Sequence, residues 1–426
     1  MTFLKRLTPF TLPFLLAACG DDNLDPNAIN APDMYEFASL TNPSSVSSVD
    51  YREATTRLVL IKELEYLIGS DYLQEYGADL NNSKEDVVLL LNRIYEGGSS
   101  NLSENNLYGP STTVTTIKGI NFTSDNTPDF SDASLMTNIN IKDAVSAKDN
   151  IQIQEWFEHI ATLAVDQDAD TRFISNGFDY QALVNGYLSV VMPFNQVNNI
   201  YLATNNLATD NSREISDLPY TQLEHNWDLA FGYFGTLASG QKSSLQNIII
   251  SNGSVDNLDS YAFDFAAATA QRDLNSPFRD VTFSQSIMHH FLNGRATISL
   301  NEEHNYFPEQ NTLINNHAEK ILYNWERALA ATLIYHIENM INNRYITDQY
   351  DYHWAMMNSY TQAIASNENS LISAELIATL TNNKAAFPQD SDEIRKQTTY
   401  LEGLYYAEQS LITSYDFTET NVNAWH

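Results

Sequence analysis

The stretch PYTQLEHNWDLAFGYFG, residues 219–235, is the part of the sequence that says most about the fold. Its apolar residues Leu223, Trp227 and Phe231 recur every four positions. This spacing places side chains on one face of a helix. We therefore predict a helix over residues 219–239 whose aromatic face packs inside a helical bundle.

Helical spacing recurs along most of the chain after residue 50. Pro219 is expected in the first turn of the helix just described, where its missing N–H costs nothing. Ser83 is expected to open another helix, because Glu85 and Asp86 follow it and Gly97 ends the pattern. The other predicted helices cover residues 52–77, 151–166, 178–207, 259–272, 279–299, 309–345, 348–366, 370–382 and 393–414.

Short connections rich in Asn, Gly and Pro separate these helices, which favours antiparallel neighbours. The sequence therefore predicts an all-α fold of two adjoining helical bundles, residues 51–210 and residues 211–426. Residues 99–150 are rich in Ser, Asn and Thr and have no helical period. We expect them to form a long irregular insertion in the first bundle, with a strand around Thr113–Ile117.

The N-terminus, MTFLKRLTPFTLPFLLAACGDD, has the features of a secretion signal. Lys5 and Arg6 precede an apolar run that is too short to span a bilayer, and the run ends in Leu-Ala-Ala before Cys19. This pattern resembles the lipobox of bacterial lipoproteins, which implies cleavage before Cys19 and attachment of a lipid to its sulfur. Residues 1–18 are then a signal peptide and residues 19–50 a lipid-anchored tether. The alternative is an ordinary secretory signal with a chance cysteine.

The composition restricts the possible locations and partners. Gly20 follows the cysteine where Asp would favour retention in the inner membrane, so the resemblance implies an outer-membrane protein that faces the periplasm or the cell surface. Cys19 is the only cysteine, and therefore the mature body has no disulfide and no thiolate metal site. The net charge of −32 disfavours nucleic acid as a partner.

The polar residues of the opening stretch are candidate metal ligands. Glu224, His225 and Asp228 lie within one helical turn of one another. One imidazole and two carboxylates can hold a divalent transition metal such as zinc or iron. The alternative is a structural network in which Asp228 orients His225 and Glu224 faces an arginine of another helix. The local spacing alone leaves both interpretations open.

Two family resemblances bear on this stretch. EHNWDLAFGYFG, together with residues 44–68 and FNQVNNIYLATNN (194–206), resembles an uncharacterised family of bacterial secreted lipoproteins known as a domain of unknown function. More remotely, the helix resembles that of the imelysin-like proteins, which have two helical bundles, a Gly-x-His-x-x-Glu motif and a link with iron uptake. In this motif His225 takes the histidine position and Asp228 the acid position, while Leu223 replaces the glycine.

Other candidate ligands are spread along the chain. Five histidines lie on predicted helices that are expected to pack together, namely His289, His290, His317, His336 and His353. Asp166, Asp168 and Asp170 match the first half of a calcium-binding loop, but Thr171 and Gly177 stand where such a loop needs its glycine and its final glutamate.

These observations favour a cell-envelope lipoprotein that acts as a binding module for a metal ion or metal complex in uptake. The alternative is a structural or protein-interaction component of the outer-membrane surface that docks another envelope protein. A third hypothesis, an enzyme that uses a carboxylate–histidine pair, lacks any known catalytic motif: the chain has no His-Glu-x-x-His, no phosphate-binding loop and no Gly-x-Ser-x-Gly. We therefore expect a protein without enzymatic activity.

Overall fold

The computed structural model confirms the all-α prediction. Helices make up most of the described chain, and the described strands form only two short hairpins. The structure describes residues 31–39, 47–69, 71–97, 116–117, 120–121, 139–166, 173–175, 177–216, 218–236, 264–276, 281–300, 308–381 and 391–425.

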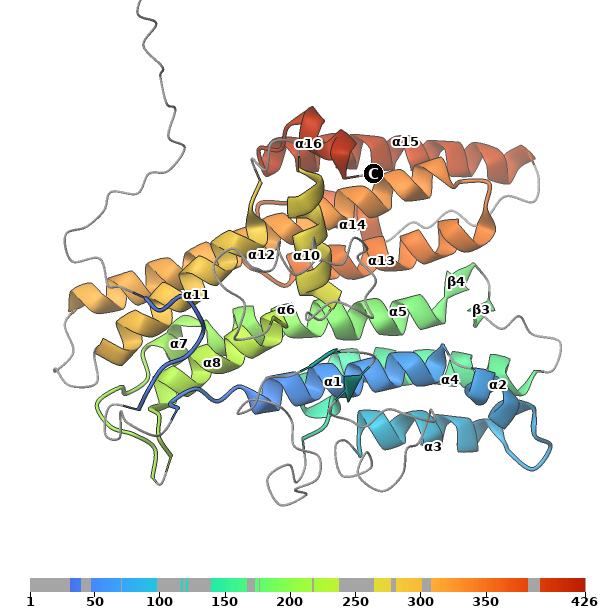
Figure 1. Ribbon diagram of the computed structural model, residues 1–426. Coiled ribbons are helices and arrows are strands. Elements are labelled where there is room, and N and C mark those ends of the chain that lie inside the picture. Colours follow the sequence, from blue (N-terminus) through green and yellow to red (C-terminus); the bar gives the residue numbers. More distant parts are fainter. Residues whose placement is uncertain are drawn as a thin grey trace, which may run out of the picture.

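The N-terminal helices form one layer of the molecule, at the bottom of Figure 1. The predicted helix 52–77 is divided at Gly69, whose N–H donates to the carbonyl of Glu65 at the end of the first segment. Ser83 caps the next helix as predicted, with Asp86 returning the bond in a capping box. The elements are α1 (Arg52–Ile68), α2 (Asp71–Ala78), α3 (Lys84–Tyr95), η3 (Lys142–Ala144) and α4 (Ala147–Val165).

Two antiparallel hairpins are the only strand pairs of the described residues. β1 (Thr116–Ile117) pairs with β2 (Ile120–Asn121), and β3 (Ile174–Ser175) pairs with β4 (Phe178–Asp179). β1 lies within the strand predicted around Thr113–Ile117. Apart from the first hairpin, residues 99–138 of the predicted insertion lie outside the described residues.

A long central run crosses the molecule between the N-terminal and C-terminal helices (Figure 1). The helix predicted over 178–207 is there, but two π-helical turns interrupt its α-helical geometry. Gly186 lets the run approach α13, since a Cβ at this position would lie 2.5 Å from Oγ of Ser359. The elements are α5 (Tyr180–Gly186), η4 (Tyr187–Val191), α6 (Met192–Gln196), η5 (Val197–Tyr201), α7 (Thr204–Leu207) and α8 (Gln222–Phe234).

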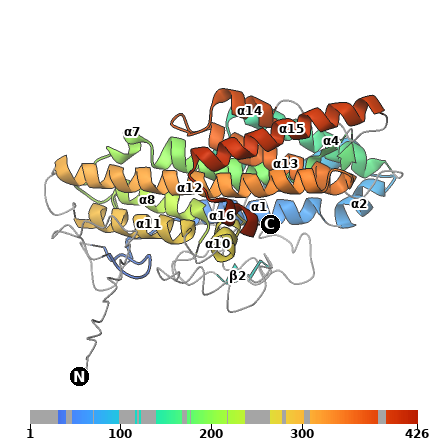
Figure 2. The same cartoon turned by 90° about the horizontal axis from the view of Figure 1, so that it is seen from above.

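The C-terminal helices pack on the opposite side of this run. α12 extends along most of the helical body, packed against α11 and α13, while α10 runs across its neighbours (Figures 1 and 2). The last short helix was not predicted. The elements are α10 (Asp264–Asn275), α11 (Phe283–Leu300), α12 (Pro308–Asn342), α13 (Thr347–Ala365), α14 (Ala374–Thr381), α15 (Ser391–Ser414) and α16 (Glu419–Ala424).

One hydrophobic core runs through all of these layers. It includes residues from Tyr35 to Trp425 and contains the aromatic residues of α8, as predicted from the opening stretch. Tyr35 is only 1% exposed, although it lies in the segment expected to be a polar tether. The N-terminal segment therefore contributes to the core before α1 begins. The division of the chain at residue 210 stays a prediction.

The described helices were also compared with the requirements of a membrane span. None of them is both long enough and apolar enough to cross a bilayer.

Candidate functional site

The first turn of α8 is fixed by a capping box. Thr221 Oγ1 accepts from the Glu224 N–H at 3.2 Å, and Glu224 Oε2 accepts from the Thr221 N–H at 3.0 Å. This reciprocal pair satisfies two amide groups that would otherwise lack partners. The helix therefore begins at Gln222, and the prediction that Pro219 lies in its first turn is wrong because the cap follows that proline by two residues.

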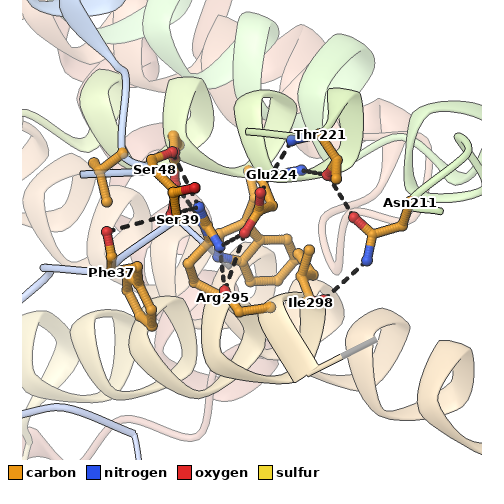
Figure 3. Close-up of polar contacts among 12 residues, drawn as sticks. Phe37, Ser39, Ser48, Asn211, Thr221, Glu224, Arg295 and Ile298 are labelled. Atoms are coloured by element: carbon orange, nitrogen blue, oxygen red, sulfur yellow. Dashed lines mark hydrogen bonds and ion pairs between the residues drawn. The ribbon is translucent and has the colours of Figure 1, made fainter. Parts of the chain in front are cut away.

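Both predicted carboxylates of α8 bind one arginine of α11. Arg295 Nε donates to Asp228 Oδ1 at 2.9 Å, and its Nη1 forms an ion pair with Glu224 Oε1. Its Nη2 donates to the hydroxyl of Ser48 at 2.8 Å, and Ser299 Oγ donates to Glu224 Oε1 at 3.0 Å. Figure 3 shows the guanidinium group of Arg295 between Glu224 and Ser48. The side chain of Arg295 is 0% exposed. Because a buried charge without an ionic partner is costly, the two carboxylates stabilise this guanidinium inside the core.

Asp228 has further partners from the N-terminal segment. The Tyr35 hydroxyl donates to Oδ1 at 2.8 Å, and the Asp50 N–H donates to Oδ2 at 3.2 Å. Burial raises the pKa of Asp228 to about 7, while the nearby Arg295 acts in the opposite direction. These bonds hold the N-terminal segment against α8 and α11.

His225 lies apart from the arginine. Its Nδ1 is 3.1 Å from the carbonyl oxygen of Asp50, and its ring stacks on Tyr220 with the centroids 4.8 Å apart. Burial lowers its pKa, which favours the neutral ring. The structure thus brings Glu224 and Asp228 together on Arg295, as the network hypothesis expects for Glu224, while His225 is held by Asp50 rather than by Asp228.

Protein groups contact all three predicted metal ligands of α8: Arg295 contacts Glu224 and Asp228, and Asp50 contacts His225. Within the described ranges, no group of three or more His, Cys, Asp or Glu side chains could hold a metal ion by itself. A metal at Glu224, His225 and Asp228 stays a prediction. Of the proposed calcium ligands, Asp168 and Asp170 lie outside the described residues, and so does Cys19.

The remaining candidate histidines meet in two pairs. His336 of α12 and His353 of α13 have their Nδ1 atoms 3.0 Å apart, and His290 of α11 and His317 of α12 have the same separation. Burial lowers the pKa of His353 to about 4 and, together with His353 and Arg272, lowers that of His336 well below its usual value. Both rings of this pair are therefore neutral at neutral pH. The ring of His289 lies beside that of His290, with the centroids 5.1 Å apart, and its Nδ1 is 3.3 Å from Nδ2 of Asn293.

His336 also lines a cleft of about 590 Å³ between the central run and α10, α12 and α13. Arg272 of α10 reaches the same cleft, where its guanidinium carbon lies 4.3 Å from the ring centre of Tyr335. Its Nη1 donates to the Trp425 carbonyl at 2.6 Å, but its buried Nε has no hydrogen-bond partner among the described atoms. The cleft thus combines a neutral histidine with a buried arginine.

The arginines were not singled out by the sequence analysis. Arg295 lies about one turn from the buried apolar residues Phe291, Leu292 and Ile298 of α11, and a cation on such a face is a sign of a buried partner. This pattern could have identified the residue. It could not have shown whether acids or a cleft lie opposite.

The comparisons with known proteins identify a family. The family model described as Domain of unknown function (DUF4856) matches residues 32–323. The chain belongs to this family. The DUF4856 match covers the arginine network of α8 and α11 and also Arg272, and it ends within α12 before His336. Neither the curated proteins nor the solved structures compared with the chain give a match.

Proposed function

We propose that this DUF4856 protein is a cell-envelope lipoprotein that binds a metal complex for uptake and catalyses no reaction. In this proposal Cys19 carries the lipid, the anchor lies in the outer membrane, and residues 51–210 and 211–426 are two adjoining bundles of the imelysin-like kind. Lipid analysis by mass spectrometry tests the anchor. The expected result is a diacylglycerol and an acyl chain on Cys19. The Cys19→Ser variant should carry no lipid and should retain its signal peptide.

The observation that carries the proposal is a pair of neutral histidines, His336, which lines the cleft, and His353 of α13, which lies beside it. Their Nδ1 atoms are 3.0 Å apart, close to the roughly 3.3 Å that two nitrogens adopt around tetrahedral zinc with bonds of about 2.0–2.1 Å. Two imidazoles fill only half of such a coordination sphere. The other ligand atoms must then come with the metal, so a complex fits this cleft better than a bare ion.

Titration of metal-free protein with Zn²⁺ supplied as its citrate complex, followed by calorimetry, tests this site. We expect near-stoichiometric binding that the double variant His336→Ala/His353→Ala abolishes. The matched control is His290→Ala/His317→Ala, which removes a pair with the same Nδ1 separation outside the cleft. Loss of binding only with His225→Ala would move the metal to α8, and no binding to the unaltered protein would overturn the proposal.

A second candidate function, docking of another envelope protein, is supported by an exposed aromatic surface. Tyr345 after α12 and Tyr405 and Tyr406 on α15 are 72%, 54% and 70% exposed, and they line a groove of about 470 Å³ between the two helices. Clustered exposed aromatics are typical of interaction sites. In this case Tyr405→Ser/Tyr406→Ser would abolish crosslinking of the protein to its envelope partner and leave Zn²⁺ binding unchanged. Unchanged crosslinking would exclude this surface.

A further inference from the structure

We infer that Arg272 is an anion-binding residue and that the cleft takes a small organic carboxylate, the anionic part of the metal complex. The inference deepens the proposed function and rests on it for the role of the metal. The site itself stands on the environment of Arg272, described next.

Arg272 is a buried cation without a balancing acid. It is 6% exposed, and among the residues that the structure describes no carboxylate pairs with it. Its partners are the Trp425 carbonyl and the face of Tyr335, and its Nε has none in the described part of the chain. A buried charge normally has an ionic partner because desolvation is costly. A bound anion in the cleft would supply it.

The acids that line the cleft are already engaged elsewhere. Glu65 forms an ion pair with Lys62 at 2.7 Å, and Asp179 Oδ1 accepts from the Ala182 N–H at 2.9 Å as the cap of α5. Arg272 is influenced by Tyr335 and Tyr360 rather than by these two acids. The volume of about 590 Å³ lies within the range of roughly 300–1,000 Å³ found for small-molecule sites. The cleft therefore has room for an organic anion beside the arginine.

The charges in the cleft decide which form of the metal can enter. Arg272 is close enough to His336 to lower its pKa, and it would repel a bare divalent cation bound to that ring. A metal held by a carboxylate chelator brings negative charge to the guanidinium and supplies the ligand atoms that the two histidines lack. Arginine recognises carboxylates well because its planar group can donate two parallel bonds.

Calorimetric titrations of the full-length protein with citrate at constant ionic strength test the inference. Unaltered protein should bind citrate with saturation, Arg272→Gln should weaken this binding at least tenfold, and Arg272→Lys should weaken it less because the charge remains. Arg344→Gln is the matched control, since Arg344 also donates to a carbonyl and lies over a tyrosine but is outside the cleft. Its citrate affinity should stay within twofold of the unaltered protein.

The affinity for Zn²⁺ without citrate should respond to Arg272→Gln in the opposite direction to the affinity for citrate. Arg272→Gln should bind bare Zn²⁺ as well as the unaltered protein or more tightly, because a repelling charge is gone. Absence of saturable citrate binding by the unaltered protein overturns the inference without the use of any variant. Citrate binding that Arg272→Gln retains within twofold also overturns it. Citrate binding without any Zn²⁺ binding would support the anion site while contradicting the metal function.

Discussion

Two buried arginines, Arg295 and Arg272, show how the same side chain serves different purposes in one core. Arg295 lies between the carboxylates of Glu224 and Asp228, and the Ser48 hydroxyl accepts one more of its bonds. Arg272 has a carbonyl and a tyrosine face but no acid among the described residues. Arg295 therefore has carboxylate partners, whereas Arg272 has none among the residues that the structure describes and borders a cleft.

This difference indicates that the network of Arg295, Glu224 and Asp228 has a structural role. The carboxylates of α8 looked like metal ligands from their spacing, yet in the structure they neutralise Arg295 and hold the N-terminal segment. A metal there would compete with an existing ion pair. The unbalanced arginine lies on α10, in a stretch that the sequence analysis treated only as a helix.

The largest expected effect comes from removing the balanced arginine. Arg295→Met leaves Glu224 and Asp228 buried without their cation and should lower the free energy of unfolding by about 3–5 kcal/mol. Arg272→Met removes a cation that lacks an acid, so its loss should be smaller, about 1–2 kcal/mol. Urea unfolding followed by circular dichroism measures both. An equal or larger loss of unfolding free energy for Arg272→Met would contradict the difference between the two arginines.

The next effect concerns the approach of α11 to α8. Gly294 precedes Arg295, and a Cβ there would lie 2.1 Å from Cζ2 of Trp227. Gly294→Ala should therefore push the helices apart and cost roughly 1–3 kcal/mol. Gly403→Ala on α15 is the control, because its Cβ would meet nothing nearer than 3.9 Å; it should gain about 0.5–1 kcal/mol from helix propensity. Thermal unfolding compares them, and a neutral Gly294→Ala would refute the tight contact.

Glu408 is a buried acid beside the partly exposed Glu338, and its protonation makes stability depend on pH. Burial and the neighbouring Glu338 raise the pKa of Glu408 to about 7. Because the folded-state pKa is raised, the stabilising contribution is complete below the unfolded value of about 4.5 and is lost as pH rises to about 7. Glu408→Gln should flatten this dependence in unfolding curves recorded from pH 5 to 8. A parallel dependence in the variant would contradict the assignment.

The smallest effect is expected at His225, on the edge of the arginine network. His225→Ala removes the stacking on Tyr220 and the contact with the Asp50 carbonyl, which should cost about 0.5–1.5 kcal/mol. Zn²⁺ binding should be unchanged if the metal occupies the His336 pair. A marked loss of Zn²⁺ affinity would instead support the metal site predicted from the sequence.

Most helices could be predicted from the sequence because their apolar residues repeat with the helical period. The division at Gly69 was missed because the apolar repeat continues from Ile68 to Tyr72, and the π-helical turns were missed because the pattern was read at the α-helical period. The candidate site was only partly predictable. The spacing of Glu224, His225 and Asp228 predicted their common helical turn and allowed an arginine of another helix opposite Glu224, but it did not identify Arg295 or its bond to Asp228.

The sequence by itself determined the helical periods, the aromatic face of α8, the cap at Ser83 and the family, because these depend on residues near one another in the chain. Only the tertiary structure decided the partner of each buried charge. Glu224 and Arg295 are 71 positions apart, and Arg272 meets residue 425 across 153 positions. Local patterns carry no information about such distances, so the balance of charges in the core, and with it the place for a ligand, follows from packing.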